Sequence, residues 1–431
     1  MIHSLFAIFP FASLHGYAII GRMEQRKETD ALHPGHVDVL DGIRALSILI
    51  VVWFHVWQQS WLVPVIRLPF LQKLGLSSIV SFDFIPRSGF LFVDMMLLIS
   101  AFCLFLPHAR AVFLGESAPR PLAFYRKRLV RIVPPYYLAV LIIFLFFSLP
   151  SGSYTGDPRW MWTDLLSTLT FTQTFFSRAF LSTAINGVLW TAAVEMQFYL
   201  LFPLLAWCFR KKPLFTYLGM VSVSMLYLQV FALGNPDSLR MTLNQLPAFF
   251  GVFANGMLAA YFYVWLSTKL RRSWKVSVPA TIAAFAGLYL IVLLLKSAPS
   301  VQPVQLWQAS HRYMQSLVFT VFILASALSA RWYRFLLSNR VMRFLALISY
   351  NLYIWHQWIA VKLKQWHIPY WEGEQAPNFT GDRVWQWKYT LLVFGVSLAV
   401  SACITYLFER PVTQLLSRQK YINRKESPHG A

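Results

Sequence analysis

The chain has 431 residues, of which 57% are hydrophobic and 13% charged, and its mean hydropathy is +0.52. This composition excludes a water-soluble globular protein and predicts an all-α polytopic membrane protein, because the apolar runs extend over about twenty residues, whereas barrel strands alternate over about ten. The net charge of +21 does not indicate a nucleic-acid partner, because the basic residues form short clusters between apolar runs, which is a signal of membrane topology.

Residues 1–36 are expected to form a cytoplasmic or interfacial segment. The first part of this segment is apolar, but it contains His3 and His15 and has no basic residues ahead of the apolar stretch. A cleaved signal peptide would begin with such a basic region, so none is expected. Met23 is an alternative start of the chain.

About ten membrane-spanning helices are predicted within residues 37–415, which we expect to form one transmembrane domain. Their limits are 43–62, 88–107, 132–150, 188–209, 214–232, 244–266, 276–296, 313–330, 341–361 and 388–408. Residues 163–181 are amphipathic and are expected to lie at the membrane interface or to re-enter the membrane. Residues 416–431 are expected to form a basic cytoplasmic tail.

Basic residues are divided unequally between alternate connecting segments, by roughly two to one. The richer set includes the N-terminal segment and the tail after Pro411. Because positively charged segments stay in the cytoplasm, both termini are predicted to be cytoplasmic.

Arg44 and His55 are the most informative polar residues of the first predicted span. Their spacing places them on nearly the same face of a helix, about 16 Å apart along its axis. Charged groups at membrane depth are costly, so we expect the imidazole to move a proton or attack an acyl carbon and the guanidinium to hold an anion. The structural alternatives are an arginine that reaches the membrane surface, an ion pair with Asp41 and a histidine hydrogen-bonded within the bundle.

Two carboxylates also fall inside predicted spans. Asp94 lies near the start of its span, where the helix dipole would stabilise it, or else it orients His55 or a hydroxyl group. Glu195 lies deeper in its span, so it either pairs with another buried polar group or marks a polar cavity.

Arginines cluster just before the third predicted span, in Phe124-Tyr-Arg-Lys-Arg-Leu-Val-Arg-Ile-Val-Pro-Pro135. Arg128 and Arg131 are three residues apart and lead directly into the span. Together with Arg126 they are placed to bind a polyanion at the cytoplasmic mouth of the bundle. Anchoring of the helix by the positive-inside rule is the alternative.

Ser349, Tyr353 and His356 share one face of the ninth predicted span, where they line a site or form polar contacts between helices. The outward loops 63–87, 151–187 and 362–387 are long enough to fold over a site. Their tryptophans are typical of a membrane-interface belt, or else they stack on a sugar; they are Trp160, Trp162, Trp366, Trp371, Trp385 and Trp387.

Cysteine usage predicts neither a disulfide framework nor a metal site. The three cysteines, Cys103, Cys208 and Cys403, lie in apolar segments without paired spacing. We expect them to face lipid or the core as small apolar residues.

Taken in order, these segments resemble the membrane-bound acyltransferase 3 family, which includes bacterial O-antigen, peptidoglycan and macrolide acyltransferases. The family's Arg-x10-His signature corresponds to Arg44 and His55, and the resemblance spans residues 37–415. The other matching motifs are Gly-Val-Asp-x-Phe-Phe-x-x-Ser-Gly-Phe at 92–102, the basic stretch before Pro-x-Tyr at 126–136, Trp-Ser-Leu-x-Val-Glu-x-Gln-Phe-Tyr at 190–199, Ser-Tyr-x-Leu-Tyr-x-Trp-His at 349–356 and Glu-x-Pro at 409–411.

The motif at 92–102 departs from the family pattern. Asp94 and Ser100 are kept. The departures are Phe92 for the first glycine, Met96 and Leu97 for the aromatic pair and Ala101 for the second glycine. This altered lining bears on the acceptor and the acyl chain more than on activity.

The resemblance implies an O-acyltransferase that moves an acyl group, expected to be acetyl, from cytoplasmic acyl-CoA to a hydroxyl of an envelope or lipid-linked carbohydrate. The expected catalytic residues are His55, Arg44, Glu195 and Asp94. The residues expected to bind the donor are Arg126, Arg128, Arg131, Ser100, Tyr353 and His356.

In this hypothesis the arginine cluster holds the phosphates of coenzyme A and Arg44 steers the pantetheine end into the bundle. His55 takes the proton of the acceptor hydroxyl or carries the acyl group briefly, and Glu195 or Asp94 sets its tautomer. The expected partners are acyl-CoA as a co-substrate, a carbohydrate acceptor and the bilayer of the inner (plasma) membrane, without a bound cofactor or nucleic acid.

A transporter or flippase of a lipid-linked sugar is the alternative function. It would also need buried charges and outer aromatic residues. It does not predict a cytoplasmic arginine cluster beside an intramembrane histidine, nor affinity for acyl-CoA.

Overall fold

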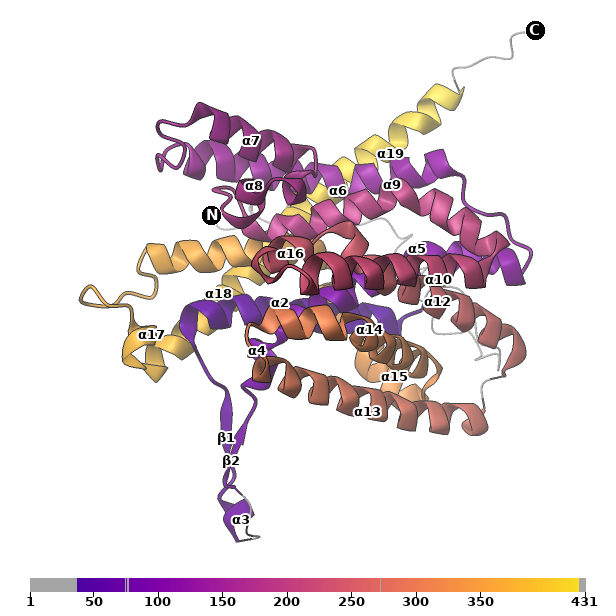
Figure 1. Cartoon of the computed structure of the whole chain (residues 1–431), viewed down its shortest axis with the longest axis horizontal. Coiled ribbons are helices and arrows are strands. Elements are labelled where there is room, and N and C mark those ends of the chain that lie inside the picture. Colours follow the sequence, from indigo (N-terminus) through magenta and orange to yellow (C-terminus); the bar gives the residue numbers. More distant parts are fainter. Residues whose placement is uncertain (1–36, 74, 76, 272, 426–431) are drawn as a thin grey trace, which may run out of the picture.

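The computed structural model describes residues 37–425 apart from 74, 76 and 272, and this part of the chain folds into a bundle of long helices (Figure 1). The predicted all-α polytopic class is therefore confirmed. The predicted N-terminal segment 1–36 and residues 426–431 of the predicted tail lie outside the described residues.

Each predicted span coincides with a long helix of the described chain. These helices are α2 (Val39–Ser60), α5 (Phe92–Phe113), α6 (Pro121–Ile143), α9 (Trp190–Lys211), α10 (Pro213–Tyr227), α12 (Leu246–Lys269), α13 (Trp274–Ser297), α14 (Val304–Leu328), α16 (Arg340–Gln365) and α18 (Arg383–Ile404). Three of them continue into π-helical turns, which are η2 (Phe144–Ser148), η5 (Leu228–Leu233) and η8 (Thr405–Glu409), and η8 leads into α19 (Arg410–Lys425).

By length and composition, 8 helices of the described chain can each cross a membrane. A ninth span arises if α14 is counted together with α15 (Arg331–Ser338), to which it is bent by 112°. The remaining predicted span, α16, has 26 residues but is less apolar, because it carries buried polar side chains such as Asn351 and His356.

Shorter elements connect these helices. The loop 63–87 forms an antiparallel hairpin of β1 (Val65–Arg67) and β2 (Ile79–Ser81) that projects away from the bundle, so it does not cover a site as its length had led us to expect (Figure 1). The other short elements are α3 (Pro69–Gln72), α4 (Phe84–Arg87), η1 (Gly89–Leu91), α7 (Pro158–Leu169), η3 (Gln173–Phe175), α8 (Ser177–Leu181), η4 (Gly187–Leu189), η6 (Pro236–Ser238), α11 (Leu239–Thr242), η7 (Ala298–Ser300) and α17 (Pro377–Thr380).

Helices α2 and α16 run parallel through the middle of the bundle. Near their C-terminal ends the Lys364 ammonium donates to the Gln59 carbonyl at 2.8 Å, and one turn or more earlier the rings of His55 and His356 lie 5.1 Å apart. This alignment brings the polar face of α16 against the polar face of α2. Two motifs that are far apart in the sequence therefore meet at one level of the bundle.

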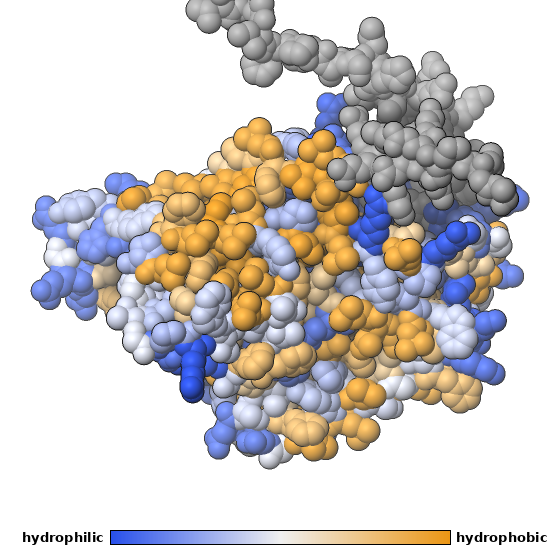
Figure 2. Space-filling model, turned by 90° about the horizontal axis from the view of Figure 1, so that it is seen from above, coloured by the Kyte–Doolittle hydropathy of each residue, from blue (hydrophilic) through white to orange (hydrophobic). Residues whose placement is uncertain are grey.

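Large apolar side chains cover much of the face shown in Figure 2, as expected of helices that face lipid. Examples are Phe146, Phe215 and Leu407, each at least 69% exposed. An aqueous protein of this size would bury such residues, because each exposed side chain forfeits about 1.5–3 kcal/mol of burial free energy.

The contact between α5 and α12 depends on a glycine. A Cβ atom at Gly256 would lie 2.3 Å from the Leu98 carbonyl oxygen and 2.7 Å from the Ala101 Cβ. The small residue therefore lets the two backbones approach closely, as is common between helices in membranes.

Replacement of this glycine should destabilise the bundle. We expect Gly256→Ala to cost about 1–3 kcal/mol, because the methyl group overlaps the backbone of α5. The matched control is Gly395→Ala in α18, where no atom lies within 4 Å of the new Cβ. Thermal unfolding of both detergent-solubilised variants measures the difference, and equal melting temperatures would contradict the packing argument.

Candidate functional site

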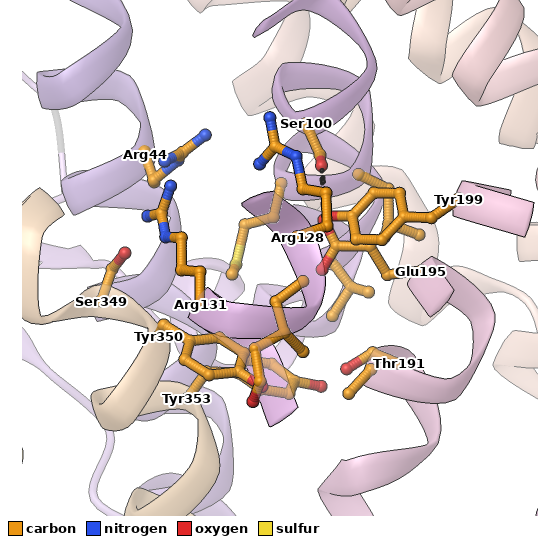
Figure 3. Close-up of a pocket in the computed structure, with 15 residues that line it drawn as sticks. Arg44, Ser100, Arg128, Arg131, Thr191, Glu195, Tyr199, Ser349, Tyr350 and Tyr353 are labelled. Atoms are coloured by element: carbon orange, nitrogen blue, oxygen red, sulfur yellow. Dashed lines mark hydrogen bonds between the residues drawn. The ribbon is translucent and has the colours of Figure 1, made fainter. Parts of the chain in front are cut away.

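A cavity of about 110 Å³ opens inside the bundle between α2, α5, α6, α9 and α16 (Figure 3). We call it the basic cavity. Its lining residues are Arg44, Val93, Met96, Leu97, Ser100, Arg128, Arg131, Ile132, Thr191, Ala192, Glu195, Tyr199, Ser349, Tyr350 and Tyr353.

Three arginines give the basic cavity its charge. Arg44 and Arg131 lie side by side, and Arg128 stands 5.7 Å from the ring centroid of Tyr199 (Figure 3). Arg131 lines the cavity and keeps an exposed part of its side chain. Since Glu195 is the one carboxylate in the lining, the cavity carries an excess of positive charge and suits an anionic ligand.

Glu195 is both paired and part of a cavity, so the two alternatives left by its sequence position both hold. Its carboxylate accepts hydrogen bonds from the hydroxyls of Ser100 and Tyr199. These bonds fix the carboxylate on the wall opposite Arg44 and Arg131 (Figure 3). It therefore does not orient His55, which was one of the roles expected of it.

A second cavity of about 170 Å³ lies further along the bundle and contains His55. We call it the histidine cavity. Its lining residues are Phe54, His55, Phe90, Val93, Asp94, Trp190, Arg240, Leu243, Asn244, Gln305, Gln308 and Tyr353. Arg44 and His55 thus face different cavities at the two levels that their spacing along α2 predicts.

The hydrogen bond of His55 fits one tautomer of its ring. Its Nδ1 lies 2.9 Å from the Oε1 atom of Gln58, and this oxygen accepts the bond when Nδ1 carries the proton. Nε2 then keeps its lone pair and is available to take up a proton. Gln58 therefore holds the position next to His55 for which a carboxylate was expected.

His356 lies against His55 but makes its own contacts. Its Nδ1 donates to the Leu352 carbonyl at 2.9 Å, and its Nε2 has no hydrogen-bond partner among the described residues. The ring is completely buried. This histidine is therefore neutral and positions the His55 ring from one side.

Asp94 pairs with a residue that the sequence analysis missed. Its Oδ2 lies 3.2 Å from the Nε of Arg312, and both side chains are 1% exposed. Arg312 also donates to the Leu243 carbonyl at 2.5 Å and lies over the Phe249 ring. The expected contact of Asp94 with His55 is replaced by this ion pair, because a buried guanidinium needs a carboxylate more than a neutral imidazole does.

A signal for Arg312 was present in the sequence. Arg312 stands in the polar run Gln305 to Ser316, immediately before the predicted span 313–330. In the structure it lies inside α14, where Gln315 and Ser316 are also completely buried. The polar run marks the face of α14 that packs into the bundle.

The two cavities share Val93 and Tyr353 in their linings. Along α5, Asp94 lines the histidine cavity and Ser100, further along the helix, lines the basic cavity. Along α9, Trp190 lines the histidine cavity and Glu195 lines the basic cavity. The cavities therefore follow one another along the bundle and are separated by the shared residues.

The remaining predicted residues lie outside these cavities. The Arg126 guanidinium donates to the Leu416 carbonyl at 3.0 Å, which ties α6 to α19. Glu409 accepts from the side-chain amide of Asn351 at 2.6 Å, in the π-helical turn η8. None of the six predicted outer tryptophans lines either cavity within the described chain; Trp190 does.

The comparisons with known proteins give one match. The model of the acyltransferase 3 family, described as an acyltransferase domain, matches residues 37–408. No curated protein and no solved structure matches the chain. The family match covers nearly all of the helical bundle, including both cavities. The chain therefore belongs to the acyltransferase 3 family and is a membrane acyltransferase.

Proposed function

We propose that this protein transfers an acyl group from acyl-CoA in the basic cavity to a carbohydrate hydroxyl in the histidine cavity. The observation that carries the proposal is the pair of adjacent cavities: three arginines line one, His55 lines the other, and Val93 and Tyr353 border both. An arginine-lined cavity suits the phosphates of coenzyme A, and an imidazole suits activation of a hydroxyl.

The size of the basic cavity supports a short acyl group such as acetyl. A volume of about 110 Å³ is well below the roughly 300–1,000 Å³ of sites for drug-sized ligands. The thioester end of the donor would occupy this space, while the nucleotide would remain near the exposed Arg131. We propose Arg44, half-buried beside Arg131, as the residue that guides the pantetheine arm.

The proposed chemistry is a direct transfer. The His55 Nε2 takes the proton of the acceptor hydroxyl while the hydroxyl oxygen bonds to the thioester carbon. The carbon–sulfur bond then breaks, and the imidazolium returns the proton to the leaving thiolate. The products are an ester of the acceptor and free coenzyme A, so atoms and charges balance without a further reactant.

The distribution of charge favours entry of the donor from the cytoplasmic side. Positive charge concentrates at the end of the bundle where α6 begins, which we predict to be cytoplasmic, and the histidine cavity lies toward the opposite end. We propose the plasma membrane as the location, with the acceptor on the outer side. Membership of the acyltransferase family weighs against the transporter alternative.

Removal of the His55 imidazole should abolish transfer. We expect His55→Ala to lower kcat by roughly 10²–10⁴-fold, because it removes the general base. The measurement is transfer of radiolabelled acetyl from acetyl-CoA to a membrane glycolipid extract by purified protein. His367→Asn is the matched control, because His367 lines neither cavity and its positive φ of 54° suits asparagine. Full activity of folded His55→Ala would refute the proposed chemistry.

The three arginines of the predicted cluster should differ in their effect on the donor. We expect Arg128→Gln and Arg131→Gln each to raise the KM for acetyl-CoA roughly 10- to 100-fold, since a hydrogen bond to a charged group contributes about 1.5–3 kcal/mol. Arg126→Gln should change it less than about threefold, because Arg126 binds a carbonyl outside the cavity. Equal effects of all three would contradict the basic cavity as the donor site.

Gln58 should act through the tautomer and charge of His55. We expect Gln58→Leu to lower kcat with little change in either KM, since the imidazole loses the partner that fixes Nδ1–H. Gln58→Glu should stabilise the imidazolium by placing a carboxylate beside it, which moves the acidic limb of the pH–rate profile to higher pH. A profile unchanged in Gln58→Glu would show that Gln58 has a purely structural role.

A further inference from the structure

We propose that the histidine cavity takes an acceptor sugar that carries an anionic group, and that Arg240 selects for the anion. The identity of the occupant as an acceptor rests on the proposed transferase function. The shape and chemistry of the cavity, and the binding that they predict, rest on contacts of the residues described below.

The cavity presents polar groups that have no partners of their own. Among the described residues, none hydrogen-bonds to the side-chain amides of Gln305 and Gln308 or forms an ion pair with Arg240. The Asn244 amide nitrogen donates to the Arg240 carbonyl at 2.9 Å, and no described residue donates to the Asn244 side-chain oxygen. Polar groups that converge on a cavity in this way require water or a ligand with several hydroxyls.

Asp94 adds a buried carboxylate to the wall of this cavity. Asp94 is 1% exposed and uses Oδ2 to bind Arg312, whereas its Oδ1 has no hydrogen-bond partner within the described chain. Asp94 lines the histidine cavity. The Oδ1 oxygen is itself buried, so Asp94 shapes the wall of the cavity through its ion pair with Arg312.

Aromatic side chains complete the wall of the cavity. Trp190, Phe54 and Phe90 line it alongside the polar groups. Apolar C–H faces of a sugar ring pack on such rings while its hydroxyls reach the amides at the edges. The combination of amides and aromatic rings is the chemistry that recognises a sugar rather than an apolar ligand.

The wall that carries Arg240 and Asn244 is fixed before any ligand binds. The segment from α11 to α12 is held by Arg312, which donates to the Leu243 carbonyl at 2.5 Å. The side chain of Gln245 in the same segment donates to the Thr174 carbonyl at 2.5 Å. A site fixed in this way loses little entropy when the sugar binds.

The charge of the cavity selects among sugars. The charge of Asp94 is offset by Arg312, so the guanidinium of Arg240 is the uncompensated charge of the described lining. Arg240 is exposed, and Asp237, three residues earlier, forms no ion pair with it within the described residues. A carboxylate or phosphate on the sugar would pair with Arg240 bidentately, whereas a neutral sugar leaves this charge without a partner.

Direct binding tests this proposal independently of catalysis. The full chain is placed in phosphatidylcholine nanodiscs, which avoid sugar-based detergents, and titrated by calorimetry with methyl glucoside, glucuronate, glucose 6-phosphate and glycerol 1-phosphate. The variants are Arg240→Gln and Gln308→Leu. The matched control is Lys388→Gln, which removes an exposed basic residue of α18 that lines neither cavity.

We expect glucuronate and glucose 6-phosphate to bind the unmodified chain at least tenfold more tightly than methyl glucoside. Arg240→Gln should remove this preference and leave the affinity for methyl glucoside unchanged. Gln308→Leu should weaken all three sugars, and Lys388→Gln should weaken none.

Three results would overturn the proposal. They are equal affinities for neutral and acidic sugars, a preference that persists in Arg240→Gln, and binding of glycerol 1-phosphate as tight as that of glucose 6-phosphate. The last result would identify a lipid headgroup site without sugar recognition. Acidic sugars that bind with the expected preference but receive no acetyl group would support the binding site and refute the proposed transfer, so the two failures are distinguishable.

Discussion

The buried ion pair between Asp94 and Arg312 holds together the part of the bundle where the two cavities meet. It joins α5 to α14, and through the Leu243 carbonyl it also fixes the segment that leads into α12. Removal of one partner of such a pair leaves an uncompensated charge in an apolar interior, which typically costs about 3–5 kcal/mol. The geometry of the histidine cavity therefore depends on a contact that does not itself touch His55.

The need of buried charges for partners of opposite charge also explains why the basic cavity suits an anion. Its arginines lie on α2 and α6 near the end of the bundle where Arg131 is exposed, and Glu195, Ser100 and Tyr199 form a hydrogen-bonded unit on the facing wall. The one carboxylate leaves an excess of positive charge, which repels itself unless an anion enters. Binding of an anion relieves the repulsion among the arginines, and this gain in free energy adds to the affinity for the ligand.

Hydropathy predicted the helical spans because each span needs about twenty apolar residues whatever its neighbours are. The pairing of side chains was harder to predict, since the partners are distant in the sequence. Asp94 and Arg312 are an example: the helix position of Asp94 suggested a dipole or a contact with His55, and nothing local indicated α14. Gln58, in contrast, is only three residues from His55 in the sequence. It was missed because an uncharged amide at a membrane surface gives no signal of a functional role.

The spacing of Arg44 and His55 predicted that both lie on one face of a helix at two levels of the bundle, but it did not predict two separate cavities. That division arises from Val93 and Tyr353, which come from α5 and α16 and border both cavities. The hairpin β1–β2 was also missed, because strands as short as three residues leave little pattern in the sequence.

The division into two chambers has a chemical consequence for the proposed reaction. A thioester in contact with water and an activating base is hydrolysed, whereas one in a closed site reacts with the hydroxyl that is positioned beside it. Val93 and Tyr353 border both cavities, and Tyr353 is 7% exposed, so these two side chains separate donor from acceptor in the proposed reaction. In the proposed reaction the acyl group alone would cross this boundary. Coenzyme A would then remain on the side from which it enters, and the acceptor would approach His55 from the other.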